Sequence, residues 1–170
     1  MKEADDKPLV NRVANSGLIT INLEDFYPKE ELLVFDLKDY LFMEMILKEK
    51  DFRAALKAHD WDQYAGKNLA IFCSADAIIP VWAYMLVAAY ATPHANIIFQ
   101  GDETTFYKVA FQRALSDFDA SQYEGQRLII KGCSNKPVPP AAYVELTSLL
   151  QPYAQSIMYG EPCSTVPVFK

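Results

Sequence analysis

The three cysteines are the residues of this chain with the most distinctive chemistry. Each is followed directly by serine and has proline close by: Cys73, Cys133 and Cys163. Thiolates are soft ligands that favour zinc, copper(I) and iron–sulfur clusters, and a thiolate is also a nucleophile. The cysteines lie far apart in the sequence and form no Cys-x-x-Cys pair, so their spacing alone does not predict a site. A shared site depends on the fold that would bring them together.

Each cysteine follows a short apolar segment that is typical of a buried strand. We expect strands at 69–72, 96–99, 128–130 and 155–159, and helices at 78–90, 104–115 and 140–150. Short apolar strands that alternate with helices predict right-handed βαβ units and a mainly parallel sheet covered by helices on both faces. The fold class is therefore α/β, a single-domain three-layer sandwich with a Rossmann-like central sheet. The strand–Cys–Ser–helix pattern is a weak internal repeat.

The first third of the chain is organised differently. Residues 1–15 are polar and are expected to form an N-terminal arm, followed by one domain over residues 16–170. Residues 18–23 alternate apolar with polar side chains, which predicts a strand near a sheet edge. A second strand is expected at 31–37. Residues 38–58 have apolar side chains at helical spacing, which predicts an amphipathic helix with a possible break at 48–51.

In an open parallel sheet every strand-to-helix loop emerges at the same edge, and ligands bind at that edge. This topology would place all three thiols there. We expect a zinc ion or an iron–sulfur cluster held by Cys73, Cys133 and Cys163, with Asp76 or Asp102 as a further ligand. The polar rim of this site would consist of Ser74, Ser134, Asn135, Glu161, Ser164 and Thr165.

Other interpretations stay open. Cysteine is often simply buried as a small apolar residue, the serines could act only as helix caps, and Asp102 could cap the following helix. One cysteine could be the nucleophile of a thiol-dependent enzyme. His59 and His94 fall in helix-to-strand connections, at the opposite edge from the cysteines, so a Cys–His dyad is disfavoured. A non-catalytic domain that forms a homodimer through the N-terminal edge strand is the third alternative.

Composition excludes several classes of protein. A formal net charge of -6 and a pI near 4.9 argue against a nucleic-acid binder, which would normally carry a basic surface. The most apolar segment, residues 78–91, suits a buried helix better than a membrane span. The N-terminus lacks the apolar core of a signal peptide, and an odd number of cysteines suits no disulfide framework. These features predict a cytoplasmic protein with reduced thiols.

Several segments together resemble a small bacterial family of unknown function. The likeness covers about residues 17–170 and is carried by ILKEKDFR, HDWDQYAGK, CSADAIIPVWAYML, KGCSNKPVPPAAY and YGEPCSTVPVFK. Members of that family are often encoded near genes of the SUF iron–sulfur assembly system. The resemblance therefore implies a role in cluster assembly or metal supply, with iron–sulfur assembly proteins as partners. It supplies no catalytic residues.

Overall fold

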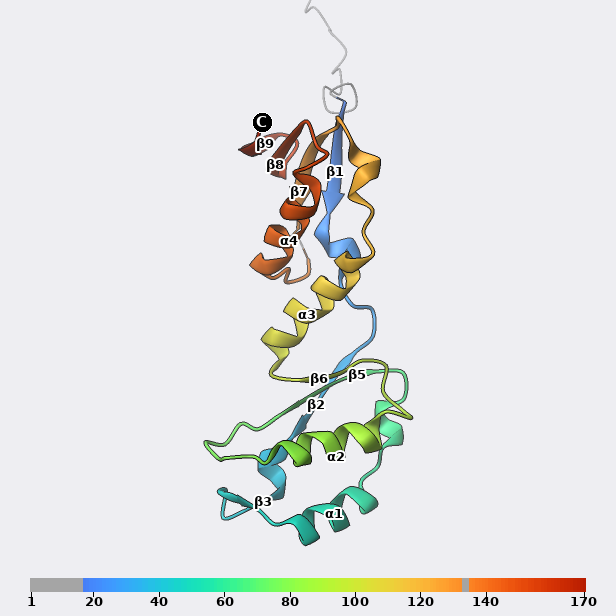
Figure 1. The fold of residues 1–170 in the computed structure, drawn as a ribbon, viewed down its shortest axis with the longest axis vertical. Coiled ribbons are helices and arrows are strands. Elements are labelled where there is room, and N and C mark those ends of the chain that lie inside the picture. Colours follow the sequence, from blue (N-terminus) through green and yellow to red (C-terminus); the bar gives the residue numbers. More distant parts are fainter. Residues whose placement is uncertain (1–16, 133–134) are drawn as a thin grey trace, which may run out of the picture. The chain divides into compact units, whose positions relative to one another are not determined.

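In the part of the chain that the structure describes, the strands form one sheet of four strands, one sheet of three strands and a small two-stranded pair. The computed structural model describes residues 17–132 and 135–170 (Figure 1). The predicted α/β class and the mainly parallel strand pairing are confirmed. The chain divides into two compact units, which we call the four-stranded unit (residues up to Tyr27 and Phe111–Lys170) and the three-stranded unit (Pro28–Ala110). The single domain over residues 16–170 stays a prediction, and the arm at 1–15 lies outside the described residues.

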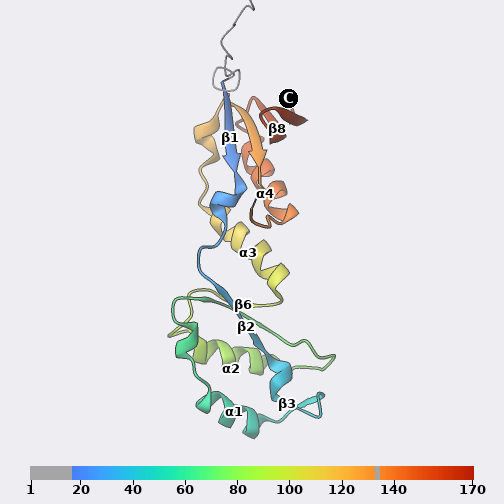
Figure 2. The same ribbon diagram turned by 180° about the vertical axis from the view of Figure 1, so that it is seen from behind.

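The sheet of the four-stranded unit joins segments from both ends of the chain. It consists of β1 (Leu18–Asn22), β7 (Arg127–Lys131), β8 (Ser156–Glu161) and β9 (Ser164–Phe169), in that order. The first three strands are parallel, and β9 returns antiparallel to β8. Figures 1 and 2 show blue β1 beside orange β7. The predicted position of β1 at a sheet edge is confirmed.

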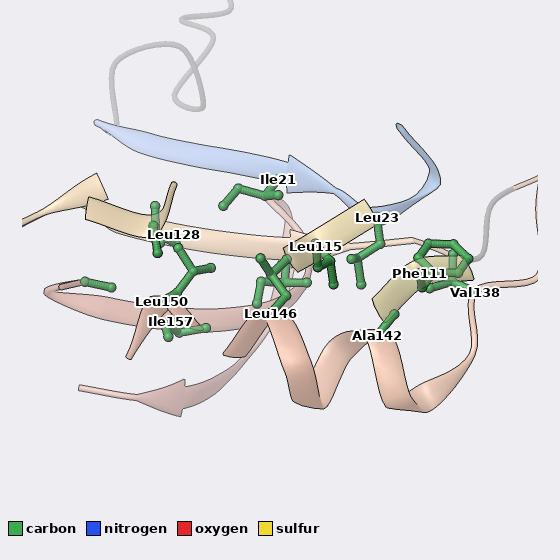
Figure 3. Packing of buried hydrophobic residues seen from close by; sticks show 13 residues of the cluster. Ile21, Leu23, Phe111, Leu115, Leu128, Val138, Ala142, Leu146, Leu150 and Ile157 are labelled. Atoms are coloured by element: carbon green, nitrogen blue, oxygen red, sulfur yellow. The ribbon is translucent and has the colours of Figure 1, made fainter. Parts of the chain in front are cut away.

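One face of this sheet is covered by α4 (Pro140–Leu150), whose bounds match the predicted helix. Its Ala142, Leu146 and Leu150 recur every four residues and are buried, which places them on one side of the helix. Figure 3 shows them packed with strand residues of the same core. Phe111 and Leu115 of α3 (Glu103–Ser116) are fully buried in this cluster. The unit also contains the short 3-10 helices η1 (Leu23–Phe26) and η4 (Ala120–Tyr123).

The three-stranded unit has a core of its own. Its parallel sheet has the order β2 (Leu32–Asp36), β5 (Asn68–Phe72) and β6 (Ile98–Gln100). The helices that lie wholly within the unit are α1 (Glu49–Ala58), α2 (Val81–Ala91), η2 (Leu37–Tyr40) and η3 (Asp62–Tyr64), and the first part of α3 also belongs to it. In the described part of the chain, every helix is too short or too polar to cross a membrane.

The predicted helix over residues 38–58 is wrong for its first half. The chain there forms η2 and then a hairpin of β3 (Leu41–Phe42) and β4 (Ile46–Leu47), and only α1 is helical. Two causes are local. The Asp36 carboxylate accepts a hydrogen bond from the backbone N–H of Lys38, which starts a short 3-10 turn. Met43 and Glu44 then adopt φ values of 52° and 57°, a left-handed turn that reverses the chain.

The two units repeat the same order of elements. Strand, 3-10 turn, helix, 3-10 turn, strand, helix and strand follow one another in both. The β3–β4 hairpin is an addition to the three-stranded unit, and β9 is an addition to the four-stranded unit. From α1 onward, each residue of the three-stranded unit corresponds to a residue of the four-stranded unit, and the number of positions between the two is constant along the sequence. Gly66 and Gly125, for example, have φ values of 69° and 68°, and each donates its N–H to an equivalent carbonyl, His94 O or Tyr153 O.

The buried residues match at the same spacing. Leu56 corresponds to Leu115, Leu69 to Leu128 and Ala83 to Ala142, and all six are buried. The weak repeat in the sequence is therefore the trace of two copies of one module. In this correspondence Cys73 matches Gly132 and does not match Cys133, so the repeated Cys-Ser motif is displaced by one residue between the copies.

Candidate functional site

Cys73 follows β5 of the three-stranded sheet and is half-buried. Its Sγ donates to the Ala75 carbonyl over 3.6 Å. The next residue, Ser74, donates its backbone N–H and its hydroxyl to the Asp36 carboxylate, at 3.0 and 2.6 Å. Burial by itself would raise the pKa of Asp36, but the hydrogen bonds from Ser74 and Lys38 outweigh it and the pKa is lowered. The hydrogen bonds between Ser74 and Asp36 thus stabilise the loop after β5.

The two carboxylates predicted as further ligands are exposed. Asp76 lies in the loop between β5 and α2. Asp102 precedes α3 and accepts from the backbone N–H and the hydroxyl of Thr105, at 2.8 and 2.6 Å. These hydrogen bonds lower the pKa of Asp102. The capping role that the sequence left open for Asp102 is therefore confirmed.

The carboxyl ends of β7 and β8 lie side by side in the four-stranded sheet. β7 ends at Lys131 and β8 at Glu161, and Lys131 Nζ is 3.4 Å from Glu161 Oε1. Exposed Cys163 lies in the turn between β8 and β9, two residues after Glu161. Cys133 comes two residues after Lys131 in the sequence, and it lies outside the described residues together with Ser134. Of the remaining rim residues, Ser164 and Thr165 begin β9.

The described part of the β7–α4 loop is tied to the start of the unit. Glu24 of η1, only 8% exposed, accepts a hydrogen bond from the Asn135 backbone N–H over 3.0 Å. Gly132 lies against α4, since a Cβ there would be 2.6 Å from the Tyr143 hydroxyl and 3.2 Å from Val138 Cγ2. The sequence did not reveal Glu24 or Gly132 as site residues. The only signal for Gly132 was a glycine at the end of an apolar strand.

The prediction that all three cysteines share one edge assumed a single sheet. Cys73 follows a strand of the three-stranded sheet, whereas the strands before Cys133 and Cys163 are neighbours in the four-stranded sheet. The shared-edge argument is therefore wrong for Cys73 and still applies to the other two. Over residues 17–132 and 135–170, no three His, Cys, Asp or Glu side chains lie close enough together to hold a metal ion. The ligand assignments stay predictions.

His59 belongs to an aromatic cluster of the three-stranded unit. Its Nδ1 is 3.3 Å from the Tyr40 hydroxyl and its Nε2 is 3.0 Å from the Tyr64 hydroxyl. Its ring packs edge-on against Trp61, with centroids 4.7 Å apart. Burial lowers the pKa of His59, although nearby Asp60 acts in the opposite direction, and burial raises the pKa of Tyr64 to about 12. These contacts give His59 a structural role in the aromatic cluster.

The lowered pKa of His59 predicts a loss of stability in weak acid. The unfolded chain binds a proton near the ordinary pKa of 6.5, whereas the folded protein resists protonation of this ring. The contribution of neutral His59 to the unfolding free energy is therefore complete above pH 6.5, and it is lost as the pH falls toward the pKa of this ring in the folded protein. We expect the unfolding free energy to fall less between about pH 7.5 and 5 in His59→Gln than in the wild type, by urea titration. An equal fall in both proteins would contradict this assignment.

A groove opens on the surface of the four-stranded unit beside α4. Its volume is about 740 Å³, and it is bordered by α4, β7, β8 and β9. The rings of Tyr143 and Tyr159, 5.7 Å apart and edge-to-face, line it. Ile130, near the end of β7, and Val138, in the β7–α4 loop, also line it, so the groove adjoins the sheet edge described above.

Comparison with known proteins gives a match at the level of a family. A family model covers residues 7–170, nearly the whole chain. No curated protein and no solved structure matches the chain. The chemistry of the site therefore follows from the contacts described here.

Proposed function

The chain belongs to the family described as Protein of unknown function (DUF2480), so its role has to be argued from the site. We propose that it is a metal-binding accessory protein that binds its metal through thiolates. The principal ligands are Cys133 and Cys163, and the bound species is zinc or an iron–sulfur cluster. The protein acts in the reducing cytoplasm, where both thiols stay free. The observation that carries this proposal is the parallel pairing of β7 and β8, each of which is followed two residues later by a cysteine.

The edge of the four-stranded sheet offers only part of a complete ligand set. Zinc takes about four ligands, and two thiolates supply half of them. Asp102 already caps α3, and Cys73 and Asp76 belong to the three-stranded unit. Open coordination positions suit a protein that receives or delivers a metal ion or cluster. The remaining ligands then come from a partner, for which iron–sulfur assembly proteins are the proposed class.

Substitution of single cysteines tests this proposal. We expect wild type and Cys73→Ser to bind Zn²⁺ with similar affinity when the reduced protein competes with a chromophoric chelator. Cys133→Ser and Cys163→Ser should each weaken binding by at least about tenfold, because each removes one of two thiolate ligands. Equal binding by all four proteins, or a loss confined to Cys73→Ser, would refute the ligand assignment.

A thiol-dependent enzyme is a second candidate, and the position of Lys131 favours it. A cation near a thiol stabilises the thiolate and makes it more nucleophilic. Lys131 Nζ lies at the edge where β7 and β8 end, 3.4 Å from Glu161 Oε1. This candidate predicts that one cysteine reacts with iodoacetamide much faster than the others at neutral pH, and that Lys131→Met slows that reaction. Uniform slow labelling would exclude it.

A further inference from the structure

We propose that the groove beside α4 binds the hydrocarbon chain of an uncharged, lipid-like small molecule. The walls come from different elements of the four-stranded unit. The groove is lined by Val144 and Thr147 of α4 and by Ile157 and Met158 of β8. Its outer wall is Val168 of β9. A volume of about 740 Å³ lies within the range of small-molecule sites, which is roughly 300–1,000 Å³.

Among the residues that the structure describes, those that line the groove carry no carboxylate, ammonium or guanidinium group. This is notable because 22% of the residues in the chain are charged. One of the few polar atoms, the Ser148 hydroxyl, already donates to the Val144 carbonyl over 2.9 Å. A charged ligand would lose its hydration here without gaining an ionic partner, whereas a hydrocarbon chain has no strong hydration to lose. The chemistry of the groove therefore complements an uncharged, apolar ligand.

Several lining side chains are exposed although they are apolar. Val144 is 67% exposed, Val168 55% and Tyr159 48%. These side chains leave apolar surface at the groove open to solvent. A chain laid along the groove would cover these side chains and remove its own methylene groups from water, which is favourable. The exposed surface thus supplies the driving force for binding.

The groove suits a small molecule better than a second copy of the chain. A stable protein interface takes about 20–30 residues from each side, more than the described residues that line this groove. The outer strand is also unsuited to strand pairing, since Pro167 of β9 has no backbone N–H to donate.

The outer wall is specific to one of the two repeated units. β9 has no counterpart in the three-stranded unit, where β6 is followed by α3. At the constant spacing of the repeat, Met85 of α2 corresponds to Val144 of α4, and both are 67% exposed. Met85 therefore offers a matched control: an equally exposed apolar residue on the equivalent helix, without a wall like β9 beside it.

The uncharged dye Nile red tests the site with the full-length chain. We expect saturable binding by fluorescence titration of the wild type. Val144→Lys places an ammonium group in the groove and should weaken binding by at least about tenfold, while Met85→Lys should leave it unchanged. Both substitutions are at exposed helix positions, so both variants should fold, which circular dichroism verifies.

Three results would overturn the proposal: no saturable binding, binding that Val144→Lys leaves intact, or equal loss in both lysine variants. A concentration-dependent dimer in sedimentation that Val144→Lys alone disrupts would assign the groove to a second copy instead. The thiol proposal is tested separately, because Val144→Lys should still bind zinc and the cysteine variants should still bind Nile red.

Discussion

Phe111→Ala is expected to lower the unfolding free energy by about 3–5 kcal/mol. The Phe111 ring is fully buried in the core of the four-stranded unit and packs edge-to-face with Tyr27, with centroids 6.1 Å apart. Its removal leaves a cavity that the surrounding strands and helix cannot fill. Because small proteins are stable by only about 5–15 kcal/mol, this one change is a large fraction of the total. Urea titration followed by circular dichroism measures it.

The repeat provides an equivalent substitution in the other unit for the same measurement. Phe52 of α1 is the counterpart of Phe111 and is 1% exposed in the other core. Phe52→Ala should therefore cost a similar amount, whereas Val144→Ala at a 67% exposed position should change stability by less than about 0.5 kcal/mol. If Phe111→Ala lowered the unfolding free energy by less than about 1 kcal/mol, that result would contradict the burial of the Phe111 ring.

Gly160→Ala should release β9 from the sheet. Gly160 has a φ of 121°, which side-chain-bearing residues rarely adopt, and its Cβ would lie 2.5 Å from the Ser164 carbonyl oxygen. The backbone strain alone costs about 1–3 kcal/mol, and the clash adds to it. Amide hydrogen exchange should therefore show lost protection in β9. Nile red binding should fall as well, because Val168 forms the outer wall of the groove.

Gly125→Ala is the matched control for backbone strain. Gly125 also has a positive φ, 68°, but its Cβ would meet nothing within 4 Å. This variant should lose about 1–2 kcal/mol of stability and keep both β9 protection and Nile red binding. If Gly160→Ala behaved like Gly125→Ala, the close contact with Ser164 would not matter for the hairpin.

The elements with strong local signals could be predicted from the sequence. The sequence predicts α4 at 140–150, the bounds that the structure shows, because Pro140 starts the helix and its buried residues recur at helical spacing. The strands β1, β2, β5 and β7 were each predicted to within a residue or two. These segments share a clear apolar pattern, and β7 is also followed directly by Gly132.

The hairpin at 41–47 and the strand β9 could not be predicted in this way. Leu41 and Met45 are spaced as on a helix, and the left-handed turn uses Met43 and Glu44 where a hairpin normally shows asparagine and glycine. In β9, Pro167 argues against a strand, and it is accommodated because β9 is at an edge of the sheet.

The division into two sheets has no local signal at all. β1 pairs with β7 from the far end of the chain, and β2 pairs with β5. Strand order depends on these long-range contacts, so the local pattern placed three cysteines on one edge where the topology supports two. Asp36 and Glu24 were missed for the same reason, since each accepts hydrogen bonds from a loop distant in sequence.

We propose that Cys133 and Cys163 form a metal site without Cys73. The most direct measurement is the zinc and iron content, with the visible spectrum, of protein purified without oxygen. Wild type and Cys73→Ser should retain the same metal or cluster, and the Cys133→Ser/Cys163→Ser double variant should retain none. Metal that persists in the double variant, or that disappears with Cys73→Ser alone, would contradict the account.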